Sequence, residues 1–357
     1  MNYQKPNSMN LSQSLLSRSN RSTELLEKIA AIRIKLKRRI TWELKRLASV
    51  PAQIAGYLSN LPFIEENILY PRYLKALREH ESALPTLNDM DAKIVDELVR
   101  SGICITSLES LAIPNTANIF KAATKIKERL KEIASLPVNQ NSSTIYATAD
   151  LLMSYPELFY WGLDERLLKI AERYLGVPVA YDGILFTLSI ADGTEHGVRT
   201  WHRDVEDRHM VRICVYLNDV DENGGPFQFM QSDTNSQIGN LDKDKDTSLY
   251  DKTPRTLSSH STSDCIKTCT GPAGTVIFAD TARHYHRGKP PTQSNRFAIF
   301  FTYFSRRPLH PYFCHRSVLS ATHLRHLTEN ICAEQRACVL WDKNLPNLVK
   351  WIPKKLT

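Results

Sequence analysis

The sequence predicts an α+β protein in which helical segments flank a β-rich region. Amphipathic helical patterns occupy the chain to about residue 176, and short strands separated by turns dominate from Val177 to about Phe304. Helix-like patterning returns after Pro308. Hydrophobic residues make up 42% and charged residues 24% of the 357 residues, as in ordinary globular proteins. No apolar run approaches the roughly 18 residues of a transmembrane helix.

The N-terminal region is expected to be a disordered tail over residues 1–20, followed by a helical extension over 21–86. The tail is rich in Ser and Asn and lacks the apolar core of a secretory signal. Over residues 24–48, apolar residues recur every three or four positions, which predicts one amphipathic helix that Ser22 or Thr23 can cap.

This helix is also the main source of the chain's positive charge. Residues 24–48 hold eight basic and three acidic residues, and so contribute +5 to a formal net charge of +8. We expect a solvated basic face, with weak contact to a membrane surface or a protein partner as the alternative. The remaining chain is nearly balanced in charge, so no nucleic-acid partner is expected.

The main domain is predicted over residues 87–308, and it begins with helices. Asn88 or Asp89 can cap the first of them, and Gly102 and Gly176 have the position of helix-ending glycines. Helices are expected, in order, near residues 89–101, 117–135 and 150–176, with a first strand over Ile103–Thr106.

Strands follow, interrupted by one long polar stretch. Val211–Leu217 alternates apolar residues with others and is the clearest strand, and Thr275–Phe278 and Arg296–Phe304 are further strands. Residues 231–270 are polar and poorly periodic, so we expect an insertion in which a lid can form. Residues 309–357 are expected to form a C-terminal helical segment.

Cysteine usage indicates a reducing compartment. The chain has seven cysteines, spread from Cys104 to Cys338, and their spacings do not match zinc sites. Together with the absent signal peptide, this odd number predicts reduced thiols in a cytoplasmic protein.

His202 and Asp204 form the first part of a candidate metal site. Residues i and i+2 of an extended chain share a face, so the imidazole and the carboxylate can bind one ion. His286 or His284 can supply a third ligand from a later strand. Two histidines and one carboxylate on one face of an octahedral ion suit non-haem Fe(II), because three positions remain open.

Arg296 opens a strand that is otherwise poor in charge. An inward-pointing arginine needs an anionic partner, and its planar guanidinium can bind a carboxylate through two N–H groups. Arg296 is therefore a candidate for binding an acidic cosubstrate.

These motifs together resemble the phytanoyl-CoA dioxygenase-like branch of the 2-oxoglutarate/Fe(II)-dependent oxygenases. The resemblance spans roughly residues 87–304, and its motifs are Trp201–Asp204, Tyr216–Val220, Asn223–Phe227 and His286–Gly288 with Arg296. It implies a double-stranded β-helix, which is a jelly-roll, cupin-like barrel, with flanking helices. It also implies that His202, Asp204 and His286 hold Fe(II) and that Arg296 binds the distal carboxylate of 2-oxoglutarate.

The activity implied by the resemblance is hydroxylation or desaturation of a small-molecule substrate with O₂. 2-Oxoglutarate is decarboxylated to succinate and CO₂ in this reaction. Asp204 favours these outcomes over halogenation, because in related halogenases a small residue replaces this carboxylate. The substrate and the oligomeric state are left open, and the insertion 231–270 is expected to cover the mouth of the pocket and to order when substrate binds.

The chain departs from the family pattern at three points. Ala298 stands where many relatives carry Ser or Thr, two residues after the arginine. His284 competes with the favoured His286 as the distal ligand. The group that meets the C1 carboxylate of 2-oxoglutarate is one of Thr187, Arg212 and Tyr216.

Two other functions compete with this interpretation. One is a demethylase of the same superfamily acting on nucleic acid or protein, for which the basic helix is the support. The other is a cupin-like binding protein without catalysis, against which the intact ligand set argues.

Overall fold

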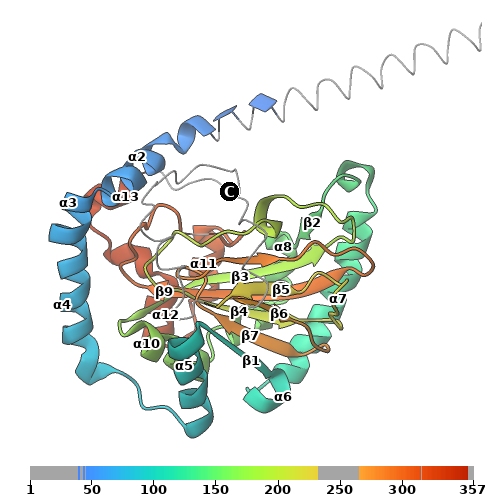
Figure 1. Ribbon diagram of the computed structural model, residues 1–357, viewed down its shortest axis with the longest axis horizontal. Helices are drawn as coiled ribbons and strands as arrows, with labels where there is room; N and C mark the ends of the chain where they lie inside the picture. Colours follow the sequence, from blue (N-terminus) through green and yellow to red (C-terminus); the bar gives the residue numbers. More distant parts are fainter. Residues whose placement is uncertain (1–38, 41–42, 45, 232–264, 315, 353–357) are drawn as a thin grey trace, which may run out of the picture. The chain divides into compact units, whose positions relative to one another are not determined.

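The computed structural model describes residues 39–352 except 41–42, 45, 232–264 and 315 (Figure 1). The predicted tail, most of the predicted basic helix and most of the predicted insertion therefore lie outside the described residues. The chain divides into two units, one up to Pro51 and one from Ala52 onward. In the first unit, Ile40, Leu44 and Leu47 of the predicted apolar stripe have helical backbone and are exposed.

Helices make up the first part of the chain and return at its end. The helical elements are α2 (Val50–Ser59), α3 (Pro62–Ile64), η1 (Glu65–Leu69), α4 (Tyr70–His80), η2 (Glu81–Ala83), α5 (Asp89–Ser101), α6 (Leu108–Leu111), α7 (Thr116–Ala134), η3 (Pro137–Asn139), α8 (Ala149–Met153), α9 (Glu157–Trp161), α10 (Glu165–Leu175), η4 (Gly197–Arg199), α11 (Ala321–Leu327), α12 (Ala333–Val339), η7 (Trp341–Asn344) and α13 (Asn347–Lys350). None of the described helices combines the length and hydropathy that a membrane span requires.

The predicted ends of α5 and α10 are confirmed. The Asn88 side chain accepts a hydrogen bond from the backbone N–H of Asp91 at 2.8 Å and so caps α5. Gly102 ends α5 with φ 75°, and Gly176 ends α10 with φ 72°. Both glycines adopt the left-handed conformation that side-chain-bearing residues rarely reach.

The strands form two antiparallel sheets, which confirms the α+β class. The larger sheet has the order β1 (Ile103–Ser107), β7 (Thr275–Ala279), β4 (Val211–Tyr216), β9 (Arg296–Ser305), β3 (Val179–Ser189) and β2 (Thr144–Tyr146). The smaller sheet has the order β6 (Ile266–Cys269), β5 (Phe227–Met230) and β8 (His286–Gly288). Every pairing within both sheets is antiparallel.

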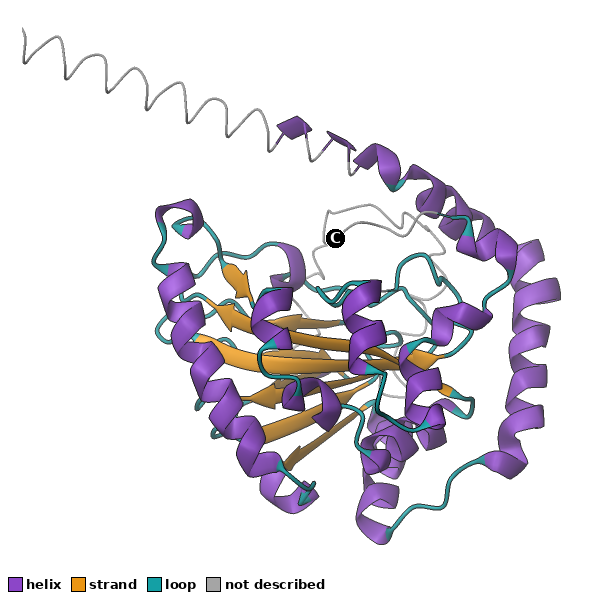
Figure 2. Cartoon of the chain, turned by 180° about the vertical axis from the view of Figure 1, so that it is seen from behind, coloured by secondary structure: helices purple, strands orange, loops and turns teal. Residues whose placement is uncertain are grey.

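The two faces of the larger sheet have different partners. Ile213 of β4 and Phe301 of β9 point to one face and share a buried cluster with residues of α5, α7, α9 and α10, which cover this face in Figure 2. Tyr216 and Ala298 point to the other face and share a buried cluster with Phe227 of the smaller sheet. The two sheets are therefore packed face to face, and side chains on their inner faces meet between them.

Two strands differ from the sequence-based expectations. β6 occupies the end of the predicted polar insertion, where Ile266–Cys269 pairs with β5. β2 pairs Thr144–Tyr146 with the end of β3. Both are short, and polar residues interrupt their apolar pattern, so the distant partner strand rather than local periodicity determines them.

Candidate metal centre

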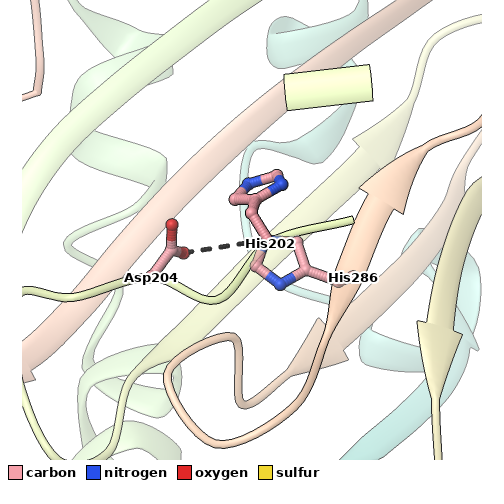
Figure 3. A group of neighbouring side chains, drawn as sticks. All are labelled: His202, Asp204 and His286. Atoms are coloured by element: carbon pink, nitrogen blue, oxygen red, sulfur yellow. Dashed lines mark ion pairs between the residues drawn. The ribbon is translucent and has the colours of Figure 1, made fainter. Parts of the chain in front are cut away.

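Three of the predicted site residues converge at one point between the sheets. His202 forms an isolated antiparallel bridge with His286 of β8, in which each backbone N–H donates to the other residue's carbonyl, at 3.1 and 2.9 Å. Asp204 is placed by its own N–H, which donates to the carbonyl of Thr281 at 2.9 Å. One ligand atom from each of these three side chains lies within 4.8 Å of the others (Figure 3).

Backbone carbonyls determine which imidazole nitrogen faces the centre. His202 Nδ1 lies 2.8 Å from the Thr200 carbonyl, and His286 Nδ1 lies 3.2 Å from the His284 carbonyl. A carbonyl can only accept a hydrogen bond, so both Nδ1 atoms carry the proton and both Nε2 atoms keep a lone pair. This is the usual way in which a metal-binding histidine is held.

Unpaired polar atoms mark the place of a missing partner. His286 Nε2 and Asp204 Oδ2 are 3.8 Å apart, and both are buried. Neither has a hydrogen-bond partner among the described residues, although Arg212 Nη2 forms an ion pair with Oδ2 at 3.1 Å. Buried polar atoms normally have a partner, so these atoms fit a bound metal ion.

The protonation states at this point suit metal binding. Burial raises the pKa of the Asp204 carboxyl, but the positive charges of Arg212 and Arg316 outweigh burial and bring the pKa well below its usual range. Burial lowers the pKa of His286 to about 3 and also lowers that of His202. The carboxylate is therefore ionised and both imidazoles are neutral, which are the forms that bind metals.

Arg296 lies between the sheets on the same strand face as Ala298. Its side chain is buried, and Nη1 donates to the carbonyl of Gly225 while Nε has no hydrogen-bond partner among the described residues. Gly288 leaves room for Nη2, because a Cβ atom at this position would lie 2.8 Å from it. The glycine of the His-Arg-Gly motif therefore accommodates the arginine.

The three residues predicted to bind the C1 carboxylate of 2-oxoglutarate differ in the hydrogen bonds that they already make within the protein. The Tyr216 hydroxyl donates to the Cys269 carbonyl at 2.7 Å and accepts from the Phe227 N–H at 2.8 Å, so its one donor is not available to a carboxylate. Thr187 is buried and donates to the Ala298 carbonyl at 3.4 Å. Arg212 reaches Asp204, with Nη2 at 3.1 Å from Oδ2.

Of these three residues, Arg212 has the most hydrogen-bond donors without an aligned acceptor among the described residues. Neither its Nε nor its Nη2 has a well-aligned hydrogen-bond partner among the described residues, although the side chain is buried. A buried guanidinium in this state has donors available for an anion.

His284 points away from the centre, although it lies two residues before His286. Its ring packs against Phe229 at a centroid distance of 4.8 Å. It also fills the space beside Gly102, where a Cβ atom would lie 2.4 Å from His284 Nε2. His284 is accordingly not among the three side chains that converge.

The structure adds residues that the sequence did not single out. Arg316, beyond the stretch covered by the family resemblance, donates to Asp204 Oδ1 at 2.9 Å and forms an ion pair with the fully buried Glu206. Arg199, the last residue of η4, is buried and pairs with Asp192 at 2.5 Å. No local pattern distinguishes either arginine from an ordinary surface residue.

A second buried network supports the turn that leads into β8. Asp280 is fully buried and accepts hydrogen bonds from the Tyr174 hydroxyl at 2.6 Å and from His209 Nδ1 at 3.0 Å. Burial raises the pKa of Asp280, but these hydrogen bonds outweigh it and leave the pKa below its usual value. The network is fully paired and has the character of a structural anchor.

Comparison with known proteins found similarity to solved structures. No family model and no curated protein matches the chain. It is similar to the non-haem α-ketoglutarate-dependent epimerase SnoN from nogalamycin biosynthesis, with 16% identity, a TM-score of 0.40, and coverage of 61% of this chain and 86% of that one. EctD from S. alaskensis, solved with 2-oxoglutarate and 5-hydroxyectoine, shows 18% identity, a TM-score of 0.41, and coverage of 67% and 89%. HygX from Streptomyces hygroscopicus, solved with nickel and 2-oxoglutarate, shows 15% identity, a TM-score of 0.39, and coverage of 62% and 88%.

Proposed function

We propose that this protein is a non-haem Fe(II)/2-oxoglutarate-dependent dioxygenase of the phytanoyl-CoA dioxygenase-like kind, acting on a small-molecule substrate. The observation that carries the proposal is the convergence of His202 with the buried Asp204 and His286, whose Oδ2 and Nε2 atoms have no hydrogen-bond partner among the described residues. Two antiparallel sheets packed face to face around this point support a jelly-roll of the double-stranded β-helix type.

His202 and His286 would hold Fe(II) through Nε2, and Asp204 through Oδ2. Two imidazoles and one carboxylate leave three coordination positions open, which suits a chelating cosubstrate and O₂. Fe(II) bound there supplies the redox chemistry for decarboxylation of 2-oxoglutarate to succinate and CO₂ and for oxidation of a substrate C–H bond. Asp204 occupies the place that a halide would need, so hydroxylation or desaturation is the proposed outcome.

Arg296 would bind the distal carboxylate of 2-oxoglutarate. Its guanidinium is buried and held from one side by Gly225, so two of its nitrogens are oriented before the ligand arrives. Ala298 offers no hydroxyl, but Thr187 lies directly opposite it on β3 and can supply one. Arg212, whose Nε and Nη2 make no well-aligned hydrogen bond although Nη2 forms an ion pair with Asp204, is the proposed partner of the C1 carboxylate.

The test is iron-dependent release of succinate from 2-oxoglutarate by the purified full chain, screened against a panel of metabolites. We expect succinate release that requires Fe(II). Both His202→Ala and His286→Ala should abolish this release. His284→Ala is the matched control, since this ring lies two residues from His286 but packs against Phe229. Loss of metal binding in His284→Ala but not in His286→Ala would contradict the assignment.

The competing functions predict different results. A demethylase acting on nucleic acid or protein would depend on the basic stretch 24–48, most of which lies outside the described residues. Its signature is salt-sensitive retention on a nucleic-acid column that deletion of residues 1–50 removes. A cupin-like binding protein would bind metal but release no succinate with any substrate.

A further inference from the structure

We propose that Arg316, from the segment that follows β9, is a positioning residue that selects which oxygen of Asp204 binds the metal. The inference rests on the proposed function of His202, Asp204 and His286 as metal ligands. It concerns a part of the chain that the family resemblance does not cover, because that resemblance ends near residue 304.

The two oxygens of Asp204 have different surroundings. Oδ1 accepts a hydrogen bond from Arg316 Nη1 at 2.9 Å. Oδ2 faces the centre, 3.8 Å from His286 Nε2, and Arg212 Nη2 lies 3.1 Å from it in an ion pair that lacks the alignment of a hydrogen bond. Asp204 is 3% exposed, so water does not compete strongly for either oxygen. Arg316 therefore holds Oδ1 by a hydrogen bond, whereas Oδ2, which has the ion pair with Arg212 but no hydrogen bond, is the oxygen that can bind a metal.

Arg316 is itself held by two further carboxylates. Its Nε pairs with Glu206, whose side chain is fully buried and accepts a hydrogen bond from the Val205 N–H at 2.8 Å. Its backbone N–H donates to Asp182 at 2.9 Å. The guanidinium thus bridges Asp204 and Glu206 through different nitrogens, and its rigid plane fixes the direction of each N–H group, which the rotatable donors of a single ammonium do not.

A β-bulge in β3 receives the segment that carries Arg316. The register between β3 and β9 shifts between Tyr181 and Ile184, and Gly183 adopts φ 87° there. A Cβ atom on Gly183 would lie 3.0 Å from the Ser317 hydroxyl oxygen, which in turn donates to the Ile184 carbonyl at 3.3 Å. The bulge thus contacts the residue next to Arg316, so contacts with β3 help to fix the position of Arg316.

A fixed carboxylate should bind the metal through one oxygen and with little reorganisation. Groups that orient metal ligands typically change metal affinity about 10- to 100-fold when they are removed. Without Arg316, Asp204 can rotate and present both oxygens, and Glu206 loses its counter-ion close to the site. We therefore expect weaker binding and an altered coordination geometry in Arg316→Ala.

The experiment measures Co²⁺ binding to the metal-free full chain by calorimetry, together with the visible absorption of bound Co²⁺, which reports coordination geometry. Arg316→Ala should bind Co²⁺ about 10- to 100-fold more weakly, with a changed spectrum. Free guanidinium should restore part of both, because the Arg316 side chain is 28% exposed and a small cation can reach the vacated place. Ser317→Ala is the matched control, since it removes the neighbouring hydrogen bond to Ile184 without touching Asp204.

The outcomes separate this inference from the proposed function. Unchanged or tighter Co²⁺ binding in Arg316→Ala, with binding lost in His202→Ala, overturns the role of Arg316 alone. Equal binding by wild type and His202→Ala overturns the metal site itself. If Arg316→Ala does not fold, Arg316→Lys decides: it keeps the charge but lacks the two nitrogens in a fixed plane that hold Asp204 and Glu206, and wild-type affinity and spectrum in this variant overturn the inference.

Discussion

Gly288→Ala provides a direct test of the space that the structure reserves for Arg296. A Cβ atom at residue 288 would lie 2.8 Å from Arg296 Nη2, whereas ordinary contact begins at 3.4 Å. The guanidinium must therefore retreat by 0.6 Å (3.4 − 2.8). It has little freedom to do so, because the side chain is 6% exposed and Nη1 is bound to the Gly225 carbonyl.

The expected loss follows from the hydrogen bonds that depend on this position. A hydrogen bond to a charged group contributes about 1.5–3 kcal/mol. Misaligning one of the two bonds between Arg296 and the distal carboxylate should weaken 2-oxoglutarate binding by about 10- to 100-fold, since each 1.4 kcal/mol is about tenfold. The metal ligands are not displaced, so metal affinity should change less than about twofold.

The assay is calorimetric titration of 2-oxoglutarate into metal-loaded protein without oxygen, in a double-mutant cycle with Arg296→Lys. If the effect acts through Arg296, Gly288→Ala should add little in the Arg296→Lys background. Wild-type 2-oxoglutarate affinity in a folded Gly288→Ala protein would refute the reasoning. So would an equal loss in both backgrounds, because the alanine would then act elsewhere.

Further predictions concern the residues around the site. Asp280→Asn should lower the free energy of unfolding by about 3 kcal/mol in urea denaturation, because it replaces an acceptor that several donors share. Accepted hydrogen bonds hold the pKa of Asp280 below its usual value despite burial, so its contribution is complete above about pH 4 and is lost as the pH falls through the folded-state pKa. The stability gap to Asp280→Asn should therefore narrow in acid, and a constant gap would contradict this account. Tyr216→Phe should lose about 1–3 kcal/mol of stability but keep 2-oxoglutarate affinity within about threefold, since its one hydroxyl donor is already bound to Cys269; a selective loss of affinity would show ligand contact. Burial raises the pKa of both Cys214 and Cys269 to about 12, so alkylation near pH 8 followed by mass spectrometry should modify the exposed Cys332 and spare these two, and early labelling of Cys214 would contradict their burial.

Local signals made part of the fold predictable. Asn88 and Gly102 delimit α5 because a capping side chain and a left-handed glycine act within one turn of the helix. The alternation in Val211–Leu217 likewise predicts a strand whose two faces have different partners, as β4 has. The spacing of His202 and Asp204 predicts a shared face, and the structure brings both together with His286.

Contacts between distant segments could not be predicted in the same way. Arg316 and Asp204 are separated by 112 residues, and nothing around Arg316 marks it as a partner of a buried carboxylate. β6 has too few apolar residues to be recognised without β5 beside it. Tyr216 was an open candidate for ligand contact, because the sequence does not show that Cys269 and Phe227 occupy its hydroxyl.

Anaerobic titration of the metal-free protein with Fe²⁺ measures whether His202, Asp204 and His286 form one metal site. We predict that the wild type binds one equivalent of Fe²⁺ tightly, that each of His202→Ala, Asp204→Asn and His286→Ala loses this binding, and that Arg296→Lys retains it. Undiminished Fe²⁺ binding in folded variants of the three converging residues would contradict it.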